Sequence, residues 1–334
     1  LRPRIYFRKN ANAWVSAPGT LMTGTATNGT WDFVISSAAM GGLAIGDVVS
    51  YYVIAQDIVT PTPNIRSNPS AGLVATDVNT VTTAPTTPNS YSVSGTLSGT
   101  YTVGATGIFP TLTAAVNTYN NSCLSGSVVF SLIDNTYPSE TYPITIAANP
   151  NSSSTNTLTI KPATGANPVF SGSSATGIIV LNGADYVTID GTNGTTANST
   201  CPRVTASRNL TIENTNTSTA SAVVALTTTS GGDGATNNRI MNTLISGNGS
   251  LTTGVAVNLS GPTIGSGTGA NGNNNNQIIN NKIIKAQVGI FSAGSSITTK
   301  SLNNTYSLNA LDSTGTNGIG RFGIMLLFED APIV

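Results

Sequence analysis

Residues 237–245 read Asn-Asn-Arg-Ile-Met-Asn-Thr-Leu-Ile, and residues 275–283 read Asn-Asn-Gln-Ile-Ile-Asn-Asn-Lys-Ile. The two stretches match position for position in their pattern of Asn and apolar residues, and residues 303–311 match more loosely. Each copy is followed by a Gly and an apolar run, so the unit recurs every 28 to 38 residues. A repeat of roughly 20 to 50 residues that contains strand-sized apolar runs predicts a β-solenoid.

Stacking explains the pattern, because each turn of a parallel β-solenoid lies directly on the one before it. We call one such turn a coil. The repeat predicts two inward-facing files of stacked side chains, the first Ile240, Ile278 and Tyr306, the second Ile245, Ile283 and Leu311.

The recurring Asn residues suit the corners of the coils. Asn tolerates the left-handed backbone conformation, and stacked Asn side chains can hydrogen-bond from coil to coil. We expect Asn242 and Asn280 to form such a ladder pair. Loops are rich in Asn in any protein, but here position as well as identity repeats, which favours the ladder.

The composition narrows the function. Charged residues make up 8% of the 334 residues, the formal net charge is zero, and there is no His. Phosphate binding needs clustered Lys and Arg, so we expect no nucleic-acid partner. No apolar run approaches the roughly 20 residues that span a bilayer, so no transmembrane segment is expected. Hydrophobic content of 39% with alternating Val, Ile and Leu argues against disorder.

The solenoid is predicted to begin at residue 96 with one helix. Leu112, Ala115, Val116 and Tyr119 fall at i, i+3, i+4 and i+7, which gives one apolar stripe on a helix ending near Asn120. An open β-coil exposes an apolar end and unpaired strand edges. We therefore expect this helix to cap the N-terminal end of the solenoid. The stretch from Gly261 to Asn276 is predicted to be a loop of Gly, Asn, Ser and Thr.

Residues 1–82 are predicted to form a small β-sandwich of the immunoglobulin or fibronectin-III type. Residues 4–8 alternate between apolar and polar types, residues 31–35 place Trp31, Phe33 and Ile35 on one face, and residues 47–57 form a long strand. The Thr/Pro segment that follows, residues 83–95, is predicted to be an extended linker. The fold class is therefore all-β, a sandwich followed by a parallel β-helix over residues 96–334.

Both ends of the chain suggest a fragment of a longer protein. The chain opens at Leu1 without a Met and has no signal-peptide pattern, and its last residues, from Ile324 to Val334, read as the first part of another coil.

Three stretches resemble a known family. They are Gly99 to Leu112, Gly126 to Phe130, and the run Asn182-Gly183-Ala184-Asp185-Tyr186-Val187-Thr188-Ile189-Asp190-Gly191. They are similar to the pectin-lyase-like right-handed β-helix segments of very large surface proteins of Bacteroidota, which are exported by the type IX secretion system and include gliding adhesins. The front module resembles the Ig-like modules that precede such coils.

The resemblance implies a location and a role. It implies an extracellular protein at the cell surface, exported by the type IX machinery, that acts as a stalk or filament and displays loops for attachment or gliding. Surface glycans or neighbouring surface proteins would be its partners, and no cofactor is implied. In an exported protein Cys123 and Cys201 can form one disulfide, which we expect; the alternative is two buried free thiols.

Two other classes remain as alternatives. A carbohydrate-active β-helix enzyme needs paired carboxylates or an acidic metal cluster. The acids of the solenoid are mostly isolated, and Asp185 and Asp190 are an odd number of positions apart, so they are expected on opposite faces of a strand. We therefore predict no catalytic and no metal residue, unless acids stack across coils. The third class is a phage tail-fibre or spike segment. The acids concerned are Asp134, Glu140, Asp185, Asp190, Glu213, Asp233, Asp312, Glu329 and Asp330.

Overall fold

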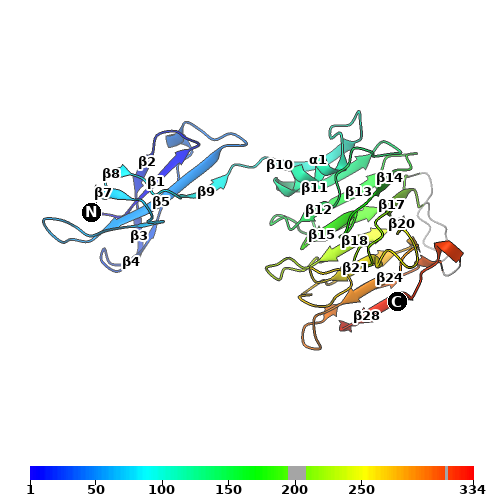
Figure 1. The fold of residues 1–334 in the computed structure, drawn as a ribbon. Helices are drawn as coiled ribbons and strands as arrows, with labels where there is room; N and C mark the ends of the chain where they lie inside the picture. The colour runs from blue at the N-terminus through cyan, green and yellow to red at the C-terminus, as the bar shows by residue number, and fades with distance from the viewer. Residues whose placement is uncertain (195–207, 313–314) are drawn as a thin grey trace. The chain divides into compact units, whose positions relative to one another are not determined.

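The structure is a computed structural model that describes residues 1–194, 208–312 and 315–334. The chain forms two compact units, Leu1–Gly95 and Thr96–Val334. Each is described by itself (Figure 1).

The first unit is built on an antiparallel sheet whose central strand is β5. The sheet order is β2-β1-β5-β6, and β9 also pairs with β5. Two hairpins, β3–β4 and β7–β8, complete the unit. The elements are β1 (Arg4–Lys9), β2 (Val15–Pro18), β3 (Thr20–Gly24), β4 (Gly29–Asp32), η1 (Ala38–Met40), β5 (Val48–Gln56), β6 (Ile65–Asn68), β7 (Val74–Asp77), β8 (Thr80–Thr83) and β9 (Asn89–Ser92).

Apolar side chains cover both faces of this sheet, as the alternation in β1 requires. Ile5 and Phe7 pack with Val49 in one cluster, whereas Tyr6 packs with Tyr52 in the other. The rings of Tyr6 and Tyr52 are stacked with their centroids 5.2 Å apart. The sheet is therefore an interior layer of the first unit.

Two sequence predictions for this unit are wrong in detail. Residues 83–95, predicted to be an extended linker, belong to the first unit: β9 pairs with β5, and the Thr86 backbone amide donates to the Ala71 carbonyl oxygen at 2.9 Å. The pairing of β6 with β5 covers only Val53 to Gln56, so the backbone groups of the first half of β5 on that side remain for an extended segment to satisfy. Composition does not reveal such a long-range pairing. The strand expected at residues 31–35 ends at Asp32, yet Phe33 and Ile35 still pack against the cluster of Ile5 and Phe7.

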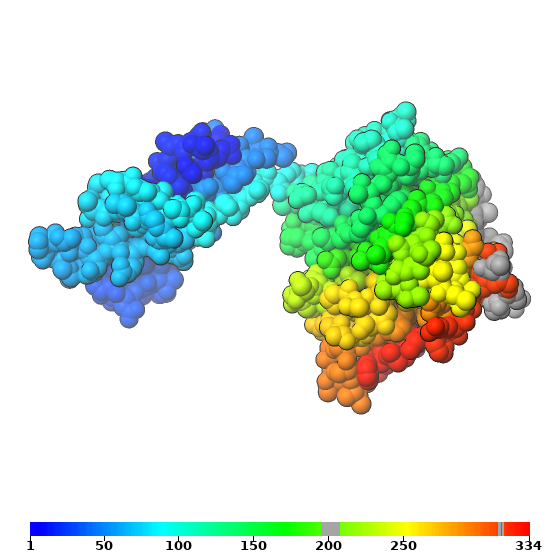
Figure 2. Space-filling model, in the orientation of Figure 1, coloured from blue at the N-terminus to red at the C-terminus, as the bar shows by residue number. Residues whose placement is uncertain are grey.

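The second unit is a parallel β-solenoid, β-helix-like, in which three sheets run along the stack. Each complete coil contributes one strand to each sheet, and all pairings within the three sheets are parallel. In Figure 2 this unit shows the chain colours as successive bands from green to red, one coil following another.

The first sheet has seven strands: β10 (Thr96–Val103), β11 (Cys123–Leu132), β13 (Leu158–Pro162), β16 (Val187–Asp190), β19 (Arg239–Met241), β22 (Gln277–Ile279) and β26 (Thr305–Ser307). The second has six: β12 (Ile144–Ala147), β15 (Ile179–Asn182), β18 (Ala222–Thr227), β21 (Val255–Ser260), β24 (Val288–Ala293) and β28 (Phe322–Leu327). The third has five: β14 (Val169–Gly172), β17 (Leu210–Asn214), β20 (Thr243–Ser246), β23 (Lys282–Ile284) and β27 (Ala310–Leu311). A two-stranded sheet, β25 (Ser301–Leu302) with β29 (Glu329–Asp330), and η2 (Gly315–Asn317) lie near the last coil.

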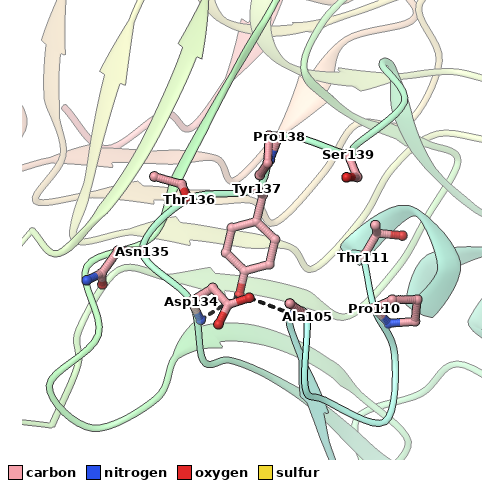
Figure 3. Close-up of a pocket in the computed structure, with 9 residues that line it drawn as sticks. All are labelled: Ala105, Pro110, Thr111, Asp134, Asn135, Thr136, Tyr137, Pro138 and Ser139. Carbon is pink, nitrogen blue, oxygen red and sulfur yellow. Dashed lines mark hydrogen bonds between the residues drawn. The ribbon is translucent and has the colours of Figure 1, made fainter.

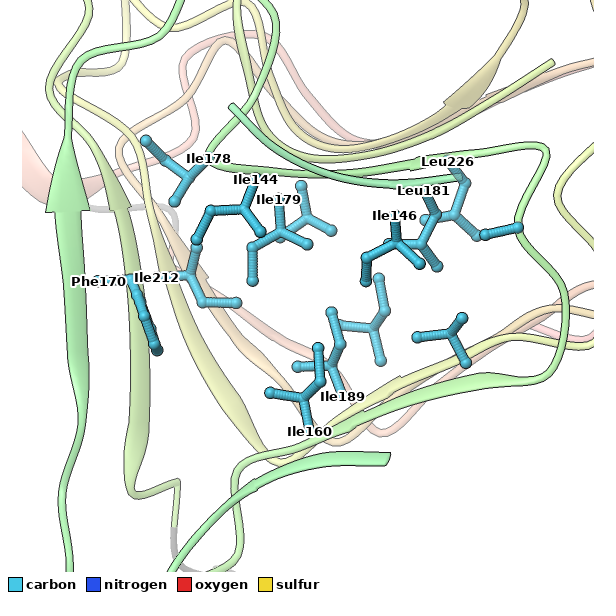
Figure 4. Packing of buried hydrophobic residues seen from close by; sticks show 14 of the residues in the cluster. Ile144, Ile146, Ile160, Phe170, Ile178, Ile179, Leu181, Ile189, Ile212 and Leu226 are labelled. Atoms are coloured by element: carbon cyan, nitrogen blue, oxygen red, sulfur yellow. The ribbon is translucent and has the colours of Figure 1, made fainter. Parts of the chain in front are cut away.

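The core lies inside the triangle of the three sheets. Figure 4 shows Ile160 and Ile189 from the first sheet, Ile146 and Leu181 from the second, and Phe170 from the third converging on one interior. All five are fully buried. Each buried Ile contributes about 1.5 to 3 kcal/mol to folding, so the stacked files are the main source of stability.

The two predicted files lie in register. Ile278 is directly between Ile240 and Tyr306, and Ile283 is directly between Ile245 and Leu311. Leu311 is partly buried and packs against the core from the edge. The spacing of the repeat therefore gave the correct pairing of strands across three coils.

The helix expected at the start of the solenoid is α1 (Leu112–Asn120), and its four buried residues are Leu112, Ala115, Val116 and Tyr119. All four belong to the solenoid core cluster. The Thr111 hydroxyl accepts a hydrogen bond from the Ala114 amide at 3.1 Å and caps the helix.

The second sheet has a further apolar cluster, which the sequence did not predict. Ala222, Ala225, Val255 and Phe291 are buried in a cluster separate from the core, and Ile264 packs against them. Ile264 belongs to the predicted Gly-rich loop, which is anchored by a hydrogen bond from the Gly265 amide to Asn258 Oδ1 at 2.9 Å. The strands β18 and β21 are consequently buried along their whole length.

Replacing Ile278 by Asp tests the core register. The new carboxylate would lie unpaired between Ile240 and Tyr306, so we expect a loss of several kcal/mol and a clear fall in the thermal midpoint. Lys282→Asp is the control, because Lys282 is exposed four positions away and should change the midpoint little. Equal midpoints for the two variants would disprove the register.

Candidate functional site

The predicted Asn pair forms part of a polar ladder along the solenoid. The Asn280 side-chain amide donates to Asn242 Oδ1 at 2.8 Å, and the Asn242 amide donates to Asp190 Oδ1 at 2.8 Å. Both Asn residues are left-handed, with φ of 54° and 58°. Three successive coils are therefore joined by side chains at one corner.

The ends of this ladder carry opposite charges. Asp190, at one end, also accepts hydrogen bonds from the amide and hydroxyl of Thr192 at 3.0 Å. At the other end, Arg208 donates from Nε to the Asn280 carbonyl oxygen at 2.8 Å and from Nη2 to Asn280 Oδ1 at 3.0 Å. A carboxylate only accepts hydrogen bonds and a guanidinium only donates them. Asp190 therefore pairs with the side-chain NH₂ of Asn242, and Arg208 pairs with the side-chain oxygen of Asn280. Partial burial lowers the pKa of Arg208.

A second ladder, fully buried, uses the other member of each Asn doublet. Asn238, Asn276 and Asn304 have no exposed surface. Asn276 Oδ1 accepts from the backbone N–H of Asn238 at 3.0 Å, and Asn304 Oδ1 accepts from the backbone N–H of Asn276 at 2.8 Å. Asn281 and Asn309 repeat the arrangement. The doublets at 237–238, 275–276 and 303–304 were the signal for this ladder, but pattern alone does not say which Asn turns the corner and which points inward.

The predicted disulfide joins Cys123 to Cys201, and the structure describes only Cys123. Cys123 begins β11 and is exposed. Cys201 lies outside the described residues, so the expected disulfide stays a prediction.

A cavity of about 390 Å³ opens beside the first loops of the solenoid. Figure 3 shows its lining, with the Tyr137 ring between Asp134 and Pro138. The Tyr137 hydroxyl donates to the Val103 carbonyl oxygen at 2.8 Å, and Asp134 Oδ2 accepts from the Ala105 amide at 2.6 Å. Burial raises the pKa of Tyr137 to about 12. Both polar side chains thus hold backbone groups of the neighbouring loop.

Glu140, close to this cavity in the sequence, is occupied in the same way. Its carboxylate accepts from the Leu112 amide at 2.5 Å, the Thr113 amide at 2.8 Å and the Thr113 hydroxyl at 2.6 Å. A carboxylate at a helix N-terminus satisfies free amide groups and interacts favourably with the helix dipole. Glu140 therefore serves to seat α1.

Asp185 is the acid whose setting comes closest to that of a catalytic group. Its pKa is raised, first by burial and further by the charge of Asp233 from the next coil, against hydrogen bonds from Thr236 that lower it. Asp185 Oδ1 accepts from the Thr236 amide at 2.7 Å and the Thr236 hydroxyl at 2.5 Å. The charge of Asp233 thus acts on Asp185 from the next coil, and sequence spacing did not predict this.

Glu329 lies in a polar cluster at the last coil. Its carboxylate accepts from the hydroxyl of Tyr306 at 3.0 Å, from the side-chain amide of Asn304 at 3.2 Å and from the Ser292 hydroxyl. Burial raises the pKa of Glu329, although these three bonds lower it. The Glu329 carboxylate closes the fully buried Asn ladder in the way that Asp190 closes the first, partly buried one.

Within the described residues, no three His, Cys, Asp or Glu side chains are grouped so that they could hold a metal ion. None of the helices in those residues is long and apolar enough to cross a membrane.

Comparison with known proteins adds no relative: no protein-family model, no curated protein and no solved structure matches the chain significantly.

Substitutions in one Asn doublet test whether its first member serves the left-handed corner and its second member the buried hydrogen bonds. Asn275 is exposed with φ of 57°, a conformation that Gly adopts without strain, so Asn275→Gly should leave stability nearly unchanged. Asn276→Gly leaves the buried amide groups of Asn238 and the Ala235 carbonyl oxygen without their partner, and should cost about 2 kcal/mol or more. Chemical denaturation measures the free energy of unfolding of both variants. Equal losses would show that the side chain of Asn276 stabilises the fold no more than that of Asn275.

The pH dependence of stability tests Glu329. Its pKa is higher in the folded chain than in the unfolded chain, so the folded state binds the proton more tightly. The resulting stabilisation is present below the ordinary carboxyl range and is lost as the pH rises through the raised pKa. We expect amide protection in β28 and β29, corrected for intrinsic exchange, to weaken over that range, and Glu329→Gln to remove the change. A wild-type profile identical to that of Glu329→Gln would contradict the expectation.

Proposed function

We propose that this chain is a structural and adhesive segment of a very large secreted cell-surface protein, a stiff stalk that displays loops for attachment or gliding. The observation that supports it most directly is the continuous register of three parallel sheets with seven, six and five strands. A coil that slid or tilted against its neighbour would break backbone hydrogen bonds in three sheets at once. Such an element resists bending, as a stalk must.

The outward side of the first sheet also favours this function. One file of side chains runs along this side in register from β10 to β26, and only one member is charged. A neutral polar surface is inert toward nucleic acid and suits hydrogen bonding to glycans or to neighbouring surface proteins. The file consists of Thr100, Val129, Thr159, Thr188, Arg239, Gln277 and Thr305.

The proposal includes the finer features that the family resemblance implies. They are a right-handed coil, an immunoglobulin-like or fibronectin-III-like first unit, export by the type IX machinery and an extracellular location at the cell surface. The antiparallel sheet of the first unit, with a hairpin packed on one of its faces, supports the second of these.

The rival function is a carbohydrate-active β-helix enzyme, and the pairing of Asp185 with Asp233 is the observation in its favour. A carboxyl group whose pKa is raised by burial can act as a general acid. Against it, Asp185 accepts two hydrogen bonds from Thr236 that orient the carboxylate toward its own scaffold. The charge arrangement therefore supports the stalk more than the enzyme.

We expect the purified chain to release no oligosaccharide from acidic or neutral polysaccharides, including pectin and alginate, because Asp134, Glu140 and Asp185 hold backbone groups of the scaffold. Chromatography and reducing-end assays measure release. Product formation that is lost in Asp185→Asn and in Asp233→Asn, while Asp312→Asn retains it, would establish the enzyme.

We also expect cells without the full protein to lose attachment, surface translocation or an outer filament layer, and to keep growing on those polysaccharides. Complementation with the intact gene is the control. A mutant with normal attachment, normal movement and an intact outer layer would refute the adhesive role.

A further inference from the structure

The first unit contains a cavity of about 670 Å³, larger than the one beside Tyr137 and within the usual size range of small-molecule sites. It lies between the hairpin β3–β4, the end of β5 and the segment that precedes β1. Its lining includes Arg2, Thr27, Trp31, Gln56, Asp57 and Ile58.

The largest apolar side chains of the lining include Trp31 and Ile58. Trp31 is partly buried at the middle of β4, and Ile58 is 82% exposed on the loop after β5. A rigid ring at a wet surface suits a ligand that has one apolar face and polar edges. The C–H face of a pyranose sugar, rimmed by hydroxyl groups, has this character.

The polar part of the lining includes the Asp57 carboxylate, which is fixed by hydrogen bonds, and the Arg2 guanidinium. Asp57 accepts hydrogen bonds from the amides of Val59 at 3.1 Å and Asn64 at 2.9 Å, and from the Asn64 side chain at 2.5 Å. These bonds lower its pKa, those from Asn64 most strongly. Arg2 is exposed and makes no hydrogen bond or ion pair with the residues that the structure describes.

We propose that this cavity binds an acidic sugar, a pyranose that carries a carboxylate. The ring would stack on Trp31, the carboxylate would pair with the Arg2 guanidinium, and a hydroxyl would donate to the lone pair that Asp57 has left. The fixed negative charge of Asp57 disfavours nucleic acid, whose phosphates need several cations. The inference rests on the proposed adhesive function, for which it names a ligand class and a site.

Tryptophan fluorescence can report binding at this site, because the chain has only two Trp residues. Trp14 does not line the cavity; its ring packs on Tyr52 with centroids 4.9 Å apart and lies under Arg8. We would titrate the purified chain with β-1,4-linked glucuronyl-glucose and with cellobiose. The two disaccharides differ only at C6 of the non-reducing ring, which is a carboxylate in the first and a hydroxymethyl group in the second. We expect a saturable change with the acidic disaccharide at millimolar concentration and at least tenfold weaker binding of cellobiose. The change should persist in Trp14→Phe and disappear in Trp31→Phe.

Calorimetry on further variants separates the roles of the side chains. Trp31→Ala should weaken binding at least tenfold, and Arg2→Gln should remove the preference for the acidic sugar. Arg66→Gln is the matched control, because Arg66 is an exposed arginine of the same unit outside the cavity, and its binding should equal that of the wild type. Circular dichroism confirms that each variant is folded.

No saturable binding, equal affinity for the two disaccharides, or full binding by Trp31→Ala would overturn the inference. Preferential binding of an oligonucleotide at the cavity would overturn it in favour of nucleic acid. These failures are distinct from failure of the proposed function, because attachment of cells is measured independently. Cells that need the protein for attachment while the chain binds no acidic sugar would retain the stalk and remove this site.

Discussion

The constraint on which the second unit depends is that every polar group buried between coils must find its partner in the next coil. Parallel stacking satisfies the backbone of the strands, but the corners leave amide and carbonyl groups unpaired. Two adjacent Asn residues meet the two needs of a corner, a change of chain direction and partners for the free backbone groups. Asn275 adopts the left-handed turn, and the Asn276 side chain hydrogen-bonds to the backbone of the preceding coil, at the Ala235 carbonyl oxygen and the Asn238 N–H.

An amide ladder has a direction, and this direction decides where the few charges of the chain are placed. In the partly buried ladder the donors point toward Asp190, so the last acceptor is a carboxylate and the first donor is Arg208. In the buried ladder, the donors of Asn304 meet the carboxylate of Glu329. With only 8% charged residues, charges at such ends are part of the architecture, and they are less available for chemistry.

The sequence was sufficient where the signal was local or periodic. The strand register through Ile278 and the stripe of α1 follow from spacing alone, because each depends on residues at fixed intervals. Spacing failed where partners are distant and aperiodic. The pairing of β9 with β5, the reach of Arg208 over 72 residues to Asn280 and the coupling of Asp185 to Asp233 have no counterpart in any window of sequence.

The same reasoning separates the scaffold from the surfaces that can carry specificity. Substitutions along the Ile and Asn files would affect neighbouring coils on both sides, so these positions are fixed by stacking. The lining of the cavity near Trp31 belongs to a hairpin and a loop of the first unit, where side chains can change without disturbing such a file. If the first unit binds a sugar and the second acts as a stalk, as we propose, recognition and rigidity belong to different units of the chain. Ligand preference could then change by substitution in the first unit while the stacked files of the second unit stay the same.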